Sequence, residues 1–228
     1  MVQGRPILWR VDRLAMDSRN AAGFGERIAT TVDALNELYG TPGEAAVRKE
    51  IDHVNDHYRA FIEAAPFVVL ATCGSGGLDC SPRGDAPGFV HVHDAKTLLI
   101  PDRRGNNRID SLHNILEDAR MALLFLIPGC GETLRVTGRA VISINPVLIE
   151  RFMVEGKAPR SVLVLMVERV YFQCARAILR SNLWDPSRHV DRKSLPSTGS
   201  ILAKLSSKKL GGESYDRALP ERLKTELY

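Results

Sequence analysis

The chain has 228 residues, with 31 Lys and Arg against 27 Asp and Glu, and its formal net charge is +4 at pH 7. With 44% hydrophobic and 25% charged residues, its composition is that of a globular protein. No stretch approaches the ~20 apolar residues of a membrane span, and residues 1–10 lack a signal-peptide pattern, so we expect a cytoplasmic protein. Four scattered cysteines without a Cys-x-x-Cys pair predict free thiols and no metal site.

Residues 1–65 are predicted to form an N-terminal helical segment. Ile28, Val32, Leu35 and Tyr39 fall at helical spacing, and Gly40 follows as a typical C-cap. A second helix is predicted from Thr41-Pro42, an N-cap followed by proline, up to Pro66. One apolar stripe supports this second helix, and its members are Val47, Ile51, Val54, Tyr58, Phe61 and Ile62.

Residues 66–184 show a different pattern, in which short runs of β-branched and aromatic residues alternate with turn residues. Because such hairpin-linked strands favour a small antiparallel barrel, we predict a mainly β fold with flanking helices. The predicted strands are Phe67–Thr72, Leu78–Ser81, Phe89–His93, Thr97–Ile100, Ala122–Ile127, Thr133–Ser143 and Val162–Phe172.

Two helices interrupt the predicted strands, and a polar arm follows them. One helix covers about Ile109–Glu117, and the other begins after the cap and proline Asn145-Pro146. Residues 185–228 form a C-terminal arm with weak helix signals after Ser200. Because this arm cannot bury much by itself, we expect it to lie on the barrel or on a second subunit.

The segment Ile100–Arg108 carries the clearest chemical signal, because it follows a strand and opens a helix. A helix start offers free backbone N–H groups and a positive dipole end, which together attract phosphate. Gly105 lets a ligand come close to the backbone, and the guanidinium groups of Arg103, Arg104 and Arg108 suit phosphate oxygens. A solvated, charged turn is the alternative interpretation.

A second basic turn lies at Cys80–Asp85, where Arg83 is predicted to project from the end of a strand. We place the two turns on adjacent strands, so that both line one site. This convergence raises a phosphate-bearing ligand to an equal footing with a solvated turn.

Several motifs in order resemble the pyridoxamine 5′-phosphate oxidase-like FMN-binding proteins, in a bacterial branch of unassigned substrate. The resemblance runs from about Phe61 to Trp184, and the final Leu-Tyr extends it. The motifs are Pro66–Thr72, Ser81–Asp85, Ile100–Arg103, Gly105–Arg108, Asp110–Leu112, Ala122–Gly129, Glu132–Gly138, Tyr171–Ala177 and Arg180–Trp184.

The resemblance implies a split-barrel homodimer with FMN at the subunit interface. Arg83 and Arg108 match positions that hold the flavin phosphate, and Gln173 falls where relatives often place His or Trp against the ring. Trp184 either covers the flavin of a second subunit or anchors the arm. The cofactor-binding residues that the resemblance implies are Ser81, Arg83, Ile100, Pro101, Asp102, Arg103, Asn106, Asn107, Arg108, Thr133, Gln173, Arg180 and Trp184.

The function predicted from these residues is an FMN-dependent oxidoreductase with a small-molecule electron donor or acceptor and no nucleic-acid partner. No catalytic residue is assigned, and haem or a deazaflavin stays open as the alternative to FMN. Because Gln173 cannot exchange a proton, a flavin-binding or stress-response protein without turnover is the second hypothesis. The constellation that holds substrate phosphate in true pyridoxamine phosphate oxidases is not found here, so that activity is not expected.

Overall fold

The first described part of the chain is a short helix. The computed structural model describes residues 29–226 and 228, and the chain divides into two compact units, Met1–Glu44 and Ala45–Tyr228. In the first unit, α1 spans Val32–Tyr39, capped by the Thr31 hydroxyl, which accepts a hydrogen bond of 3.2 Å from the backbone N–H of Ala34. The predicted helix and its end at Gly40 are confirmed there, while Ile28 lies outside the described residues.

The second predicted helix is wrong in its middle. Instead of one helix from Pro42 to Pro66, the chain forms α2 at Glu44–Arg48 and α3 at Asp56–Ala64. Between them, Ile51 exchanges two backbone hydrogen bonds with Val170, of 3.1 and 2.8 Å. The backbone therefore extends the sheet at this point, and an extended residue cannot also continue a helix.

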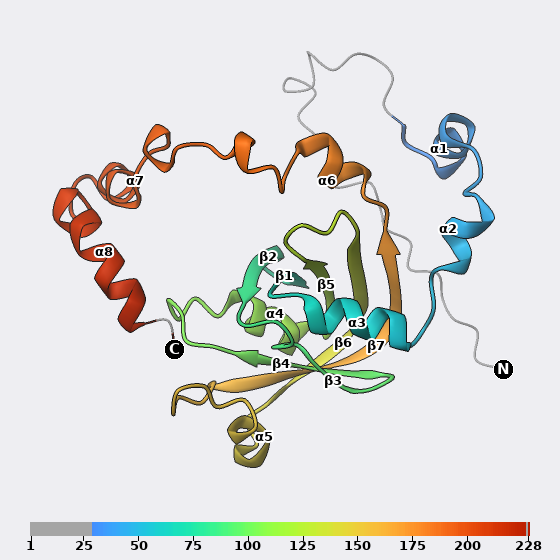
Figure 1. The fold of residues 1–228 in the computed structure, drawn as a ribbon, viewed down its shortest axis with the longest axis horizontal. Helices are drawn as coiled ribbons and strands as arrows, with labels where there is room; N and C mark the ends of the chain where they lie inside the picture. Colours follow the sequence, from blue (N-terminus) through green and yellow to red (C-terminus); the bar gives the residue numbers. More distant parts are fainter. Residues whose placement is uncertain (1–28, 227) are drawn as a thin grey trace. The chain divides into compact units, whose positions relative to one another are not determined.

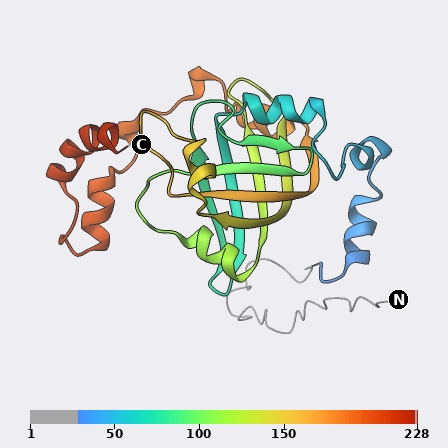
Figure 2. The ribbon, with the colours of Figure 1, turned by 90° about the horizontal axis from the view of Figure 1, so that it is seen from below.

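Most of the apolar stripe that suggested one continuous helix is nevertheless buried or partly buried, whereas Val47 on α2 is exposed. Asn55 begins α3 as its N-cap, with its side chain accepting a hydrogen bond of 2.9 Å from the N–H of Tyr58. Val54, Tyr58 and Ile62 then pack into the core. In Figure 2, α3 lies across one end of the strands, so these residues cover that end of the core.

One antiparallel sheet of seven strands forms the centre of the second unit (Figure 1). Its order is β2-β1-β5-β6-β7-β4-β3, so β2 and β3 are the edges. Each strand overlaps one predicted from the sequence, which confirms the mainly β fold. The strands are β1 (Phe67–Gly74), β2 (Gly77–Gly84), β3 (His91–Asp94), β4 (Thr97–Asp102), β5 (Arg120–Leu126), β6 (Thr133–Ser143) and β7 (Ser161–Gln173).

The two longest strands, β6 and β7, bend the sheet. Their register shifts between Thr137 and Gly138, which is the mark of a β-bulge. A Cβ on Gly138 would lie 1.9 Å from the carbonyl oxygen of Met166, so only glycine allows this close approach. Figure 2 shows the strands curling around a common interior.

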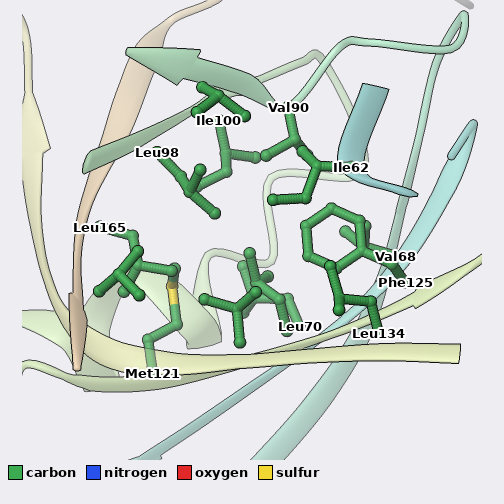
Figure 3. Close-up of a cluster of buried hydrophobic side chains, with 14 of the residues drawn as sticks. Ile62, Val68, Leu70, Val90, Leu98, Ile100, Met121, Phe125, Leu134 and Leu165 are labelled. Carbon is green, nitrogen blue, oxygen red and sulfur yellow. The ribbon is translucent and has the colours of Figure 1, made fainter. Parts of the chain in front are cut away.

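The core fills this interior with aliphatic and aromatic side chains (Figure 3). Burial alternates along β1 and β5, because successive side chains of a strand point to opposite faces. Val68, Leu70 and Phe125 point inward and meet Ile100 from β4, which is fully buried.

Helices connect and flank the strands. The prediction of α4 (Asp110–Glu117) and of α5 (Pro146–Glu150), with Asn145 as N-cap, is confirmed. Beyond β7 the chain forms α6 (Arg176–Ser181), which the sequence analysis did not predict. No helix within residues 29–226 is both long and apolar enough to cross a membrane.

The C-terminal arm contains two 3-10 turns and then a helical hairpin, α7 (Thr198–Leu205) and α8 (Glu213–Thr225). Asp216 of α8 ties the hairpin together, because its carboxylate accepts hydrogen bonds from the Ser197 hydroxyl (2.5 Å) and the Gly199 N–H (2.7 Å). The end of the arm returns to the barrel, where the Tyr228 hydroxyl donates to Asp85 (2.7 Å).

The bulge at Gly138 yields a test of the fold. Gly138→Ala forces a methyl group against the backbone of β7, so we expect the free energy of unfolding to fall by about 1–3 kcal/mol. Urea titration followed by circular dichroism measures this change. The control is Gly76→Ala, since a Cβ there meets nothing within 4 Å and should change stability by less than about 0.5 kcal/mol. Equal stabilities of the two variants would contradict the bulge.

Candidate functional site

The turn between β4 and α4 is the predicted phosphate-binding segment, and it opens a helix as expected. β4 ends at Asp102 and α4 begins at Asp110, with no side chain capping the first N–H groups of the helix. The Asn106 side chain accepts a hydrogen bond of 2.9 Å from the Arg108 N–H, and Asn107 adopts a left-handed φ of 60°. Asparagine tolerates this conformation better than most residues, so the two asparagines shape the turn.

Arg83 reaches this turn from β2, although not in the way the sequence suggested. The prediction that the two turns belong to adjacent strands is wrong, because four strands separate β2 from β4 in the sheet. The curl of the sheet brings them together instead. The Arg83 Nε lies 3.6 Å from a carboxylate oxygen of Asp102, the last residue of β4.

A chain of hydrogen bonds holds Arg83 in place. Its Nη1 donates to the Ser81 hydroxyl and to the Pro82 carbonyl, each at 2.9 Å. The Ser81 hydroxyl lies 3.0 Å from that of Ser111 in α4, which in turn donates to Asp79. Ser111 is buried, so this chain joins β2 firmly to the start of α4.

A cleft of about 260 Å³ lies where the two turns meet. It contains seven of the predicted site residues together with Arg104 and Arg160. The predicted residues that line the cleft are Arg83, Pro101, Asp102, Arg103, Asn106, Asn107 and Arg108. Five arginines thus surround a cleft whose lining contains one carboxylate.

Burial raises the pKa of that carboxylate, Asp102, although the charges of Arg83 and Arg160 act in the opposite direction. The negative form of Asp102 is therefore disfavoured, which reduces its competition with an anionic ligand for the arginines.

The five guanidinium groups differ in how far the protein neutralises them. Arg103 is held by Asp85 at 2.7 Å, and Arg108 by Asp110 at 2.9 Å. Among the described residues, Arg104 and Arg160 form no ion pair. The Arg160 guanidinium donates one hydrogen bond, to the Asn107 side chain (3.0 Å). These two cations are the ones available to an anion.

Arg160 was missed by the sequence analysis. It directly precedes β7, and the register that pairs Ser161 with Asp102 places it beside the end of β4. Its N–H donates to the Asp102 carbonyl at 3.2 Å. A sequence prediction that paired the strand Thr97–Ile100 with the strand Val162–Phe172 would have placed Arg160 beside the predicted turn.

Four other predicted residues lie at the far ends of β6 and β7, outside this cleft. Thr133 pairs with Gln173 across the two strands, and the Gln173 side chain accepts a hydrogen bond of 3.1 Å from Arg135. The Trp184 indole donates to the Cys130 carbonyl at 2.7 Å, while Arg180 is exposed on α6. The Ile100 side chain, also predicted for the site, points into the core.

The curled antiparallel sheet with helices on its surface is a split barrel, the class of fold expected from the sequence. Residues 54–174 match the family profile of pyridoxamine 5′-phosphate oxidase, and this match spans more than half of the chain. The chain therefore belongs to the pyridoxamine 5′-phosphate oxidase-like family. A search of curated protein sequences gave no match.

Similar solved structures match about half of this chain at low sequence identity. HupZ of Group A Streptococcus is 20% identical over 51% of this chain and 91% of its own, with a TM-score of 0.42. A candidate pyridoxamine 5′-phosphate oxidase from Lactobacillus delbrueckii is 18% identical over 53% and 95%, with a TM-score of 0.42. An FAD-binding protein of Mycobacterium smegmatis is 9% identical over 53% and 95%, with a TM-score of 0.36.

Asp85 links the cleft, the turn and the end of the arm, and its ionisation is testable. Burial alone would raise the pKa of Asp85, but hydrogen bonds from Tyr228, the Ala86 N–H and Arg103 outweigh it and lower the pKa. A carboxyl whose pKa is lowered on folding stabilises the protein above its unfolded pKa. That stabilisation is lost as the pH falls through the folded pKa, below the ordinary value of 3.8.

We therefore expect Asp85→Asn to lower the free energy of unfolding at pH 7 by about 3 kcal/mol, since Arg103 keeps a charge without its partner. The free energy of unfolding of Asp85→Asn should stay below that of the parent protein down to about pH 4, and the two values should converge only at lower pH. Urea unfolding at a series of pH values measures this. Asp118→Asn, in an exposed pair with Arg120, is the control and should lower the free energy of unfolding much less than Asp85→Asn does. A difference between Asp85→Asn and parent that already closes near pH 6 would contradict this account.

Proposed function

We propose that the chain is an FMN-dependent oxidoreductase in which the β4–α4 turn holds the flavin phosphate. The observation that carries this proposal is the cleft lined by five arginines, two of which have no ion-pair partner among the described residues. Their uncompensated charge suits a phosphate dianion, and the uncapped start of α4 offers N–H donors beside it.

The residues of the cleft fit the phosphate end of FMN, with different roles. Arg104 and Arg160 would supply charge directly. Arg83, fixed by Ser81, would supply a guanidinium group in a set orientation, and pre-organised donors lose little entropy on binding.

A second copy of the chain would complete the site. A cleft of about 260 Å³ is smaller than the ~300–1,000 Å³ of typical ligand pockets, so it suits the phosphate end better than a whole flavin. Thr133, Gln173, Arg180 and Trp184 lie outside it, and in a homodimer they would approach the ring from the partner. Symmetric two-fold dimers are the commonest oligomers, which adds to this proposal.

When bound, FMN supplies the hydride or electron transfer, and the protein binds, orients and tunes it. Cationic groups near the flavin ring would favour its anionic reduced form, whereas the arginines of the cleft would hold the phosphate. Gln173 accepts a hydrogen bond from Arg135, and its amide cannot act as a general acid or base. Its role would therefore be to position the ring.

That property of Gln173 also supports a second candidate, a flavin-binding protein without rapid turnover. Stopped-flow mixing of the FMN-loaded protein with NADPH or NADH separates the two. Bleaching of the flavin absorbance within seconds supports the oxidoreductase, whereas bound flavin that stays oxidised with both donors supports the binder.

Replacing two arginines tests where the phosphate lies. Arg83→Ala combined with Arg108→Ala removes two charged contacts of ~1.5–3 kcal/mol each, so FMN should bind two to four orders of magnitude more weakly. Quenching of flavin fluorescence on titration gives the dissociation constant.

The control removes the same number of charges elsewhere. Arg120 and Arg139 are exposed on β5 and β6, outside the cleft, so Arg120→Ala with Arg139→Ala should leave FMN affinity within about threefold of the parent. Equal losses in the two double variants would indicate a general charge effect. An unchanged affinity for the Arg83/Arg108 variant would show that the phosphate lies elsewhere.

A further inference from the structure

A second, larger cleft lies between the C-terminal arm and the barrel. Its volume is about 880 Å³, which falls within the range of small-molecule sites. One wall is the β4–α4 turn with Arg103 and Arg104, together with Arg160 just before β7, and the phosphate cleft shares these three residues. The other wall is α8 and the chain end, so this cleft exists only because the arm returns to the barrel (Figure 1).

The arm is held in that position by specific contacts. Tyr228 donates a hydrogen bond to Asp85, and its ring lies over the Arg103 guanidinium at 5.5 Å. The hydrogen bond to Asp85 is the main reason why the pKa of Tyr228 is raised, so the hydroxyl stays protonated and able to donate. Asp216 fixes α8 against α7, and the wall is therefore a defined surface.

The charge in this cleft is positive. Arg103 is matched by Asp85, but Arg104 and Arg160 have no ion-pair partner within residues 29–226 and 228. Arg222 adds a third cation from the arm. Its nearest carboxylate, Glu226, is 3.9 Å away at an exposed helix position, where ion pairs contribute little.

The arm side of the cleft is apolar and aromatic. Leu219, Leu223, Tyr215 and Tyr228 line it, and the Arg222 guanidinium lies 4.6 Å from the centre of the Tyr215 ring. Aromatic rings and stacked guanidinium groups accept flat ligands on their faces. Cations from both walls, together with the flat apolar groups of the arm, select a molecule that is both anionic and aromatic.

We propose that this cleft is a second ligand site, for a planar aromatic anion. The anionic group faces Arg222, with Arg104 and Arg160 at the border that this cleft shares with the phosphate cleft, and the ring lies against the tyrosines and leucines of the arm. As a binding site, it stands independently of FMN.

Binding of anilinonaphthalene sulfonate, a planar aromatic anion that fluoresces when bound, tests the proposal on the full-length protein. Arg222→Ala should weaken the dye about tenfold, because one charged hydrogen-bonding group is lost. Lys224→Ala is the matched control, since it removes a cation of the same helix that pairs with Glu221 outside the cleft, and it should leave dye binding unchanged. Phenylnaphthylamine, a neutral dye with the same ring system, should bind with no dependence on Arg222.

FMN affinity is measured on the same variants, so that the two proposals fail separately. Arg222→Ala with normal FMN affinity and weakened dye binding supports the second site. Dye binding that depends on Arg222 in a protein that never binds FMN also supports the site, while it refutes the FMN function. Absence of dye binding, equal binding by both variants, or parallel loss of dye and FMN in Arg222→Ala would overturn the second site.

Discussion

Repulsion between like charges at one turn is the constraint on which the structure of this site depends. Five guanidinium groups lie around the β4–α4 turn, from Arg83, Arg103, Arg104, Arg108 and Arg160. Asp85 and Asp110 each pair with one of them, and Asp102 lies near a third. Within residues 29–226 and 228, no carboxylate forms an ion pair with Arg104 or Arg160, so a phosphate group bound at the helix start, as we propose, would compensate their charge.

The barrel makes this crowding possible. β2 and β4 are far apart in the order of the sheet, and only its curl brings Arg83 to Asp102. The curl depends in turn on the bulge at Gly138 and on a core that is filled from every strand except β2. Stability and function are therefore linked, because a change that flattens the sheet also separates the arginines.

Local patterns allowed much of this to be predicted, whereas long-range geometry did not. The strands, the helix end at Gly40 and the cap at Asn145 were evident because alternation and capping are properties of neighbouring residues. The helix predicted across Ile51 is wrong because the backbone of Ile51 forms a β-bridge with the distant residue Val170. Strand adjacency and the role of Arg160 were likewise missed, since they depend on which strands pair.

The central claim is that the cleft recognises a phosphate, and comparison of FMN with riboflavin tests it most directly. The two flavins share the ring and ribityl chain and differ only in the phosphate group. Isothermal titration of the full-length protein with each gives the ratio of their dissociation constants. We predict that FMN binds at least a hundredfold more tightly than riboflavin, and that the difference shrinks as salt rises. Equal affinities for the two flavins would contradict the claim.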